Sequence, residues 1–93
     1  MSRKTALKGI PFKYQAPEAI SVSLAGSFNG WNVSAHPLKK NKDGIWSTVV
    51  KLFPGTYEYL YVIDDEWWRD DPNCEIHQYN RYGGHNCLLI VEE

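Results

Sequence analysis

Short runs of alternating apolar and polar residues, separated by turn sequences, constrain this chain more than any other feature. Residues 45–52 place Trp46, Val50 and Leu52 on one side, and residues 56–63 place three tyrosines on one side. Between them stands Phe-Pro-Gly, where Pro fixes φ and Gly accepts a positive φ. A period of two over runs of this length indicates β-strands. The pattern predicts an all-β chain.

Further runs of the same kind occupy residues 11–15, 20–25 and 86–91. About seven or eight short strands at this spacing are typical of a β-sandwich. The alternation also predicts which side chains face the core. These are Leu24, Trp46, Val50, Tyr57, Tyr59, Tyr61 and Leu89.

The length of 93 residues fits one domain. We expect residues 1–9 to form a flexible tail and residues 10–93 to form a single binding module. The net charge of -1 provides no basic field to attract nucleic acid. No apolar run approaches the length of about 18 residues needed for a membrane span, and the N-terminus lacks the apolar core of a signal peptide. These features predict a cytoplasmic protein that binds neither nucleic acid nor membrane.

Acidic residues are concentrated at 64–66 and 70–71. A pair of carboxylates about 5–10 Å apart could hydrolyse a glycoside. However, Asp is also favoured in turns, because its side chain bonds to the local backbone. A small sandwich offers no deep cleft that would raise the pKa of a carboxyl group. We therefore expect no catalytic residues.

Two cysteines and two histidines stand as Cys74-x-x-His77 and His85-x-Cys87, which raises the question of a zinc site. The spacing matches none of the common zinc-finger patterns closely. Cys87 also shares its parity with Leu89, which favours packing in the core. We expect both cysteines to be reduced, with no metal and no other cofactor.

The aromatic content, 14% with four Trp and six Tyr, exceeds what the core positions use. Trp31 lies in a turn-rich segment, and Trp67 and Trp68 are adjacent, so on a strand they would face opposite sides. Exposed rings near a polar group such as Asn86 suit a pyranose. The sugar's C–H face stacks on a ring while its hydroxyls bond to amides and charged side chains.

The string Gly-Ser-Phe-Asn-Gly-Trp at 26–31, followed by the tyrosine-rich run at 54–64, resembles the family 48 carbohydrate-binding modules. Asp-Gly-Ile-Trp at 43–46 and Gly-Gly-His-Asn at 83–86 extend the resemblance over residues 12–91. The resemblance implies an immunoglobulin-like, early-set β-sandwich. It also implies non-catalytic binding of α-1,4-glucans such as glycogen, starch and maltooligosaccharides.

By position, the resemblance implies that Trp31 is one sugar-stacking residue and that either Trp67 or Trp68 is the second. The sequence Ile63-Asp64-Asp65-Glu66-Trp67 predicts a tight hairpin, which aligns Trp67, whereas counting back from Asp71-Pro72 favours Trp68. Asn86 matches an asparagine that bonds to glucose hydroxyls. Tyr82 stands where the related glycogen-binding domains have a leucine that supports the sugar.

One departure concerns a sugar-binding lysine of the family, which is Leu60 here. Parity places Leu60 on the ligand side, so a donor is lost, and Arg69 is a candidate to replace it. The loss favours an alternative: an interaction or scaffold domain of the same fold that no longer binds sugar. Such a domain would have a protein partner in a complex of the glycoside-hydrolase or kinase type.

Overall fold

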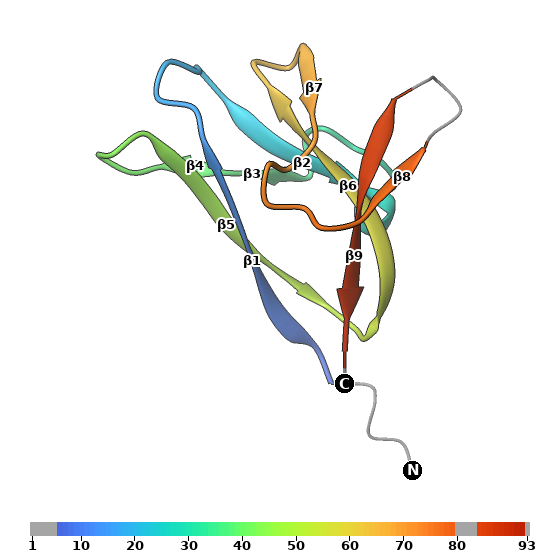
Figure 1. The fold of residues 1–93 in the computed structure, drawn as a ribbon. Coiled ribbons are helices and arrows are strands. Elements are labelled where there is room, and N and C mark those ends of the chain that lie inside the picture. The colour runs from blue at the N-terminus through green and yellow to red at the C-terminus, as the bar shows by residue number, and fades with distance from the viewer. Residues whose placement is uncertain (1–5, 80–83, 93) are drawn as a thin grey trace.

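The computed structural model describes residues 6–79 and 84–92, and they form two antiparallel β-sheets packed as a sandwich (Figure 1). The first sheet has the strand order β1-β5-β4. Its strands are β1 (Lys8–Gln15), β5 (Ile45–Leu52) and β4 (Lys39–Lys40). The pairing of β1 with β5 runs over the full length of both, from Lys8 opposite Leu52 to Gln15 opposite Ile45.

The second sheet has the order β3-β2-β6-β9-β8, and β7 also pairs with β6. Its strands are β3 (His36–Pro37), β2 (Val22–Gly26), β6 (Gly55–Ile63), β9 (His85–Val91), β8 (His77–Tyr79) and β7 (Trp67–Arg69). A 3-10 turn, η2 (Ser27–Asn29), follows β2. Because β2 occupies one edge of β6, β9 and β7 pair with the other edge, one after the other along the strand.

This arrangement confirms the predicted all-β sandwich of the immunoglobulin-like, early-set type. The predicted run at 45–52 coincides with β5, whereas β1 begins at Lys8, inside the segment expected to be a tail. Three strands of two residues or three, β3, β4 and β8, were not predicted, whereas β7 begins at Trp67, where the hairpin was expected. Runs this short contain too few positions to show a period. Among residues 6–79 and 84–92, no helix has the length and hydropathy to cross a membrane.

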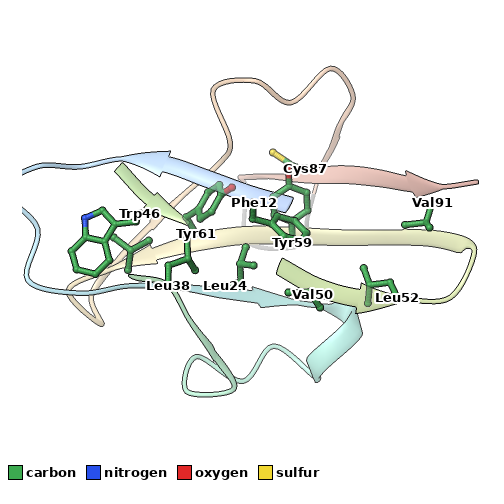
Figure 2. Packing of buried hydrophobic residues seen from close by; sticks show 11 residues of the cluster. Phe12, Leu24, Leu38, Trp46, Val50, Leu52, Tyr59, Tyr61, Cys87 and Val91 are labelled. Atoms are coloured by element: carbon green, nitrogen blue, oxygen red, sulfur yellow. The ribbon is translucent and has the colours of Figure 1, made fainter. Parts of the chain in front are cut away.

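The core lies between the two sheets, as Figure 2 shows. Five of the side chains predicted to be buried are buried: Leu24, Trp46, Val50, Tyr59 and Tyr61. The other two, Tyr57 and Leu89, are partly buried and pack against the same cluster. The alternation therefore assigned every one of these side chains to the correct face.

The polar atoms of the buried aromatic side chains form hydrogen bonds at the edge of the core. Trp46 Nε1 donates to the carbonyl of Ala16 at 2.8 Å, and the Tyr61 hydroxyl donates to the carbonyl of Lys13 at 3.0 Å. The Tyr59 hydroxyl donates to Asp71 Oδ2 at 2.7 Å. Burial raises the pKa of both tyrosines, so both remain neutral hydrogen-bond donors.

Candidate functional site

The second sheet has an outer face, directed away from the core, formed by the residues that alternate with the buried tyrosines. Tyr59 and Tyr61 point inward, so Glu58, Leu60 and Val62 of β6 point outward. The strand register extends this face to the neighbouring strands. Its members are Ser23, Ala25, Pro37, Glu58, Leu60, Val62, Trp68, Gln78, Asn86 and Leu88.

The hairpin between β6 and β7 decides which of the two adjacent tryptophans joins this face. Ile63 pairs with Trp67, and Val62 pairs with Trp68. Directly opposed residues in an antiparallel pair point to the same side of the sheet. Trp68 therefore lies on the outer face beside Val62, with 43% of its surface exposed.

Trp67 occupies the opposite side of β7. Trp67 is 50% exposed, and the guanidinium carbon of Arg69 lies 5.3 Å from the centre of its ring, so a cation lies over one of its faces. Arg69 pairs with Tyr61 and shares the Trp67 side. Arg69 therefore does not replace the missing lysine on the outer face.

The hairpin loop takes this form because of its two aspartates. Asp64 and Asp65 adopt left-handed conformations with φ of 56° and 58°, and Glu66 N donates to the Ile63 carbonyl at 3.0 Å. Asp64 Oδ1 also accepts hydrogen bonds from the amides of Ile20 at 2.7 Å and Ser21 at 3.1 Å. The carboxylate of Asp64 thus holds the backbone and is not presented to a substrate.

Asn86 supplies an amide to the outer face. Asn86 stands one residue before Cys87, which pairs with Tyr59, so in the antiparallel ladder it lies opposite Leu60. Trp68 pairs with Val62, two residues along β6, which is about 7 Å away. Its side chain is only 6% exposed, and Nδ2 donates to Glu58 Oε1 at 3.0 Å. This bond fixes the orientation of the amide.

Glu58 and Gln78 are two polar residues of this face that were missed from the sequence. Gln78 pairs directly with Asn86 across β8 and β9. Glu58 could have been found, because it shares its parity with Leu60. Gln78 gave no such signal, since β8 is too short to show alternation.

Leu60 lies on the outer face, as predicted, but its side chain is 8% exposed. It stands between Ala25 of β2 and the level of Asn86. An aliphatic residue in this place forms an apolar floor between the amide and the indole of Trp68. It adds no hydrogen-bond donor.

Trp31 is presented by a turn that one asparagine holds together. Asn29 Oδ1 accepts from the amides of Gly26 at 3.1 Å and Asn32 at 3.2 Å, and its Nδ2 donates to the Leu24 carbonyl at 3.1 Å. Gly26 has no space for a side chain, since an added Cβ would lie 2.7 Å from the Glu58 carbonyl. Trp31 itself is left-handed, with φ of 63°, and 36% exposed.

The turn that carries Trp31 and the amide of Asn86 share one anchor. Ser27 Oγ accepts a hydrogen bond from the Glu58 amide at 3.1 Å, and the Glu58 carboxylate accepts from Asn86. Segments distant in sequence are thereby tied to the same residue of β6. Tyr82, the remaining candidate, lies outside the described residues.

The second acidic segment also has a structural role. Asp71 accepts from the Tyr59 hydroxyl through Oδ2 and from the Asn73 amide through Oδ1 at 2.9 Å. Asp70 Oδ2 lies 3.3 Å from His77 Nε2. The carboxylates of Asp64, Asp70 and Asp71 are therefore all engaged with the protein itself.

Comparison with known proteins gives a family match over most of the chain. The family model for carbohydrate-binding module 48 (isoamylase N-terminal domain) matches residues 1–80. The protein PTST homolog 2 of Arabidopsis thaliana is 38% identical over 73 residues, or 78% of this chain. The FLOURY ENDOSPERM 6 protein of rice is 37% identical over 73 residues, also 78% of this chain. The 1,4-alpha-glucan branching enzyme GlgB of Corynebacterium jeikeium is 49% identical over 56 residues, or 59% of this chain.

These relatives are much longer than the part of them that matches. The matched segment covers 13% of the Arabidopsis and rice proteins and 8% of the branching enzyme. The comparison also contradicts the prediction of a cytoplasmic location. The Arabidopsis and rice relatives are both named as chloroplastic proteins, and the features used for that prediction do not detect such a location.

Proposed function

The chain belongs to the carbohydrate-binding module 48 family, and from this premise we propose that its outer face binds α-1,4-glucans without catalysing a reaction on them. The main support is the register that places Trp68 and Asn86 on one face of the second sheet. An indole and an oriented amide about 7 Å apart along the strand match the two chemical sides of a glucose ring. The name of the branching-enzyme relative refers to the same class of glucan.

In this proposal, Trp68 stacks on the apolar face of one glucose unit, and Asn86 bonds to hydroxyl groups. Gln78, directly beside Asn86, provides a second amide at the margin. Leu60 and Val62 form the apolar floor between these groups. Trp31, held by the turn that is anchored on Glu58, stacks on a neighbouring unit of the same chain. Tyr82 remains a proposed support for the sugar.

The proposed absence of catalysis rests on the acidic side chains. Asp64 accepts two backbone amides, and Asp71 accepts a tyrosine hydroxyl and an amide. A glycosidase needs one carboxylic acid and one carboxylate, both free to face the scissile bond. Carboxylates committed to hairpin and turn geometry are poorly placed for that purpose.

Binding at a shallow face should be modest in strength, because little area is buried and flexible sugars must be ordered. We expect a dissociation constant between about 1 μM and 1 mM, which corresponds to about -8 to -4 kcal/mol. Replacing Trp68 or Trp31 with Ala should remove much of this. Stacking of nucleic-acid bases on aromatic side chains, a measured analogue, contributes about 1–3 kcal/mol for each ring.

The adjacent tryptophans provide a matched pair of variants for the test. Trp68→Ala and Trp67→Ala remove the same side chain from neighbouring positions on opposite sides of β7. In a calorimetric titration with maltoheptaose, Trp68→Ala should bind at least about tenfold more weakly than the unaltered chain. Trp67→Ala should change the affinity less than twofold. A larger loss for Trp67→Ala would place the stacking residue on the other side of β7.

The absence of a hydrogen-bond donor at Leu60 favours a second candidate function, an interaction domain that no longer binds sugar. In that case the partner is a protein, and the outer face carries no glucan. The same titration separates the two functions. No heat and no fluorescence change with any α-glucan, in protein shown to be folded, would select the interaction domain.

A further inference from the structure

On the side of the second sheet opposite the outer face, three side chains with metal-binding atoms come together. One ligand atom from each of Cys74, His77 and Cys87 lies within 4.8 Å of the other two. Cys74 comes from the turn that follows Asp71, His77 from β8 and Cys87 from β9. His77 and Cys87 are directly paired across these two strands. Figure 2 shows Cys87 at one edge of the core cluster.

The groups around these three side chains are those that commonly surround a metal site. His77 Nε2 lies 3.3 Å from Asp70 Oδ2, and coordination through Nδ1 would leave that contact in place. Ligating histidines usually donate their other ring N–H to such a carboxylate. The amide of Asp71 donates to Cys87 Sγ at 3.1 Å. A backbone N–H directed at sulfur stabilises the negative charge of a thiolate. Burial nevertheless raises the pKa of the Cys87 thiol to about 12, and both thiols donate to backbone carbonyls, so a bound metal ion would have to displace their protons.

We propose that Cys74, His77 and Cys87 bind one Zn²⁺ ion, with water in the fourth position. Two thiolates and one imidazole suit zinc, which prefers sulfur and nitrogen ligands in a tetrahedral arrangement. With a Zn–S bond of about 2.3 Å, two sulfurs of such a site stand about 3.8 Å apart. Each pair of ligand atoms lies within 4.8 Å, so the three need to approach one another by about 1 Å at most. On binding, each thiol releases one proton to solvent, and the two thiolates balance the charge of the ion.

The three ligands come from segments whose spacing in the sequence matches no common zinc motif, and the fold brings them together. Zinc would connect the segment between β7 and β8 to β9. Among the described residues this segment already meets β9 through the Asp71–Cys87 contact and a hydrogen bond from the Leu88 amide to the Ile76 carbonyl. In Figure 1 this segment is the orange loop that leads from β7 into β8. A cross-link here would stabilise the edge of the sheet that presents Trp68 and Gln78 on its other side.

The test uses the full chain, reduced and freed of metal, and adds Zn²⁺ or Co²⁺ alone. We expect one zinc per chain after gel filtration, an upward shift of Tm with zinc, and a thiolate-to-cobalt charge-transfer band. Cys74→Ser and His77→Gln should each lower metal affinity at least tenfold and weaken this band. The His77 side chain is exposed, so His77→Gln should retain the fold. His36→Gln, which changes a histidine outside the cluster, is the matched control and should bind zinc as the unaltered chain does.

Failure to retain zinc in the folded, reduced chain would overturn the proposal. So would a cobalt band that persists in both Cys74→Ser and His77→Gln. Quantitative formation of a Cys74–Cys87 disulfide in air, together with no metal binding after reduction, would assign the pair to redox chemistry instead. None of these outcomes depends on whether the outer face binds glucan.

Discussion

The two sides of strand β6 differ although their residues alternate along the same nine positions. The inner side carries Tyr59 and Tyr61, whose rings stand edge-on at 5.9 Å and whose hydroxyls are bonded to protein groups. The outer side carries Glu58, Leu60 and Val62, bordered by Asn86 and by the exposed ring of Trp68, and both Leu60 and Val62 are themselves buried.

The difference separates stability from recognition. Large aromatic side chains on the inner side fill the space between two sheets, so removing one leaves a cavity. On the outer side the β6 residues are smaller, and the exposed aromatic ring, Trp68, belongs to β7. A substitution on the inner side should therefore act on folding, whereas a substitution of an exposed outer residue such as Trp68 should act on binding.

The largest effect should come from the inner side. Tyr61 has no exposed surface, so Tyr61→Ala should reduce the free energy of unfolding by about 3–5 kcal/mol, as large-to-small core changes do. Urea denaturation measures this loss. Leu60→Ala, one residue away on the outer side, should cost less than half as much. Equal losses would show that the outer side is packed as a second core.

The next effect concerns the turn that presents Trp31. Asn29→Ala removes the acceptor of two amides and the donor to the Leu24 carbonyl, so it should cost about 1–3 kcal/mol of stability. It should also weaken maltoheptaose binding, because Trp31 loses its fixed position. Asn32→Ala is the control, since among the residues that the structure describes its side chain accepts one hydrogen bond, from the local amide of Ser34. A variant with normal glucan affinity would show that Trp31 does not need this turn.

A smaller effect, in the opposite direction, should follow from adding a donor to the outer side. Leu60→Lys introduces a charged group beside the amide of Asn86. A long side chain can keep its stem in the apolar floor and its ammonium at the surface. We expect affinity for maltoheptaose to increase about threefold to tenfold, or about 0.7–1.4 kcal/mol, by calorimetry. Leu60→Met, without a donor, should leave it unchanged. Weaker binding by a folded Leu60→Lys would mean that the sugar does not pass over this position.

The smallest effect is expected at Ser23, on the outer side of β2. Its hydroxyl is buried and has no hydrogen-bond partner within residues 6–79 and 84–92. Ser23→Ala removes an unsatisfied polar group, so thermal unfolding should show a gain of about 0.5–1 kcal/mol. Ser47→Ala, at an exposed position of β5, should show no gain. A loss at Ser23 would indicate that the hydroxyl has a partner in solution.

Alternation in the sequence was enough to predict the main strands and the side that each residue faces. The period of two is a local property, and burial of one face enforces it along β5 and β6. For the same reason Leu60 was correctly placed opposite the tyrosines, and Trp46 was correctly placed in the core. The short strand β8 was missed because three residues cannot display a period, whereas β7 was indicated by the hairpin expected at residues 63–67.

Only the tertiary structure shows which of Trp67 and Trp68 shares a face of the sheet with Asn86. Insertion of one residue into a hairpin loop moves every later side chain to the other face of the sheet. The left-handed Asp64 and Asp65 set that loop, because their backbone pairs Ile63 with Trp67. The meeting of Cys74, His77 and Cys87 likewise depends on how β8 pairs with β9. The sequence by itself determined which residues alternate, and the pairing of strands in space determined which of them stand together, because register is a property of two segments and not of one.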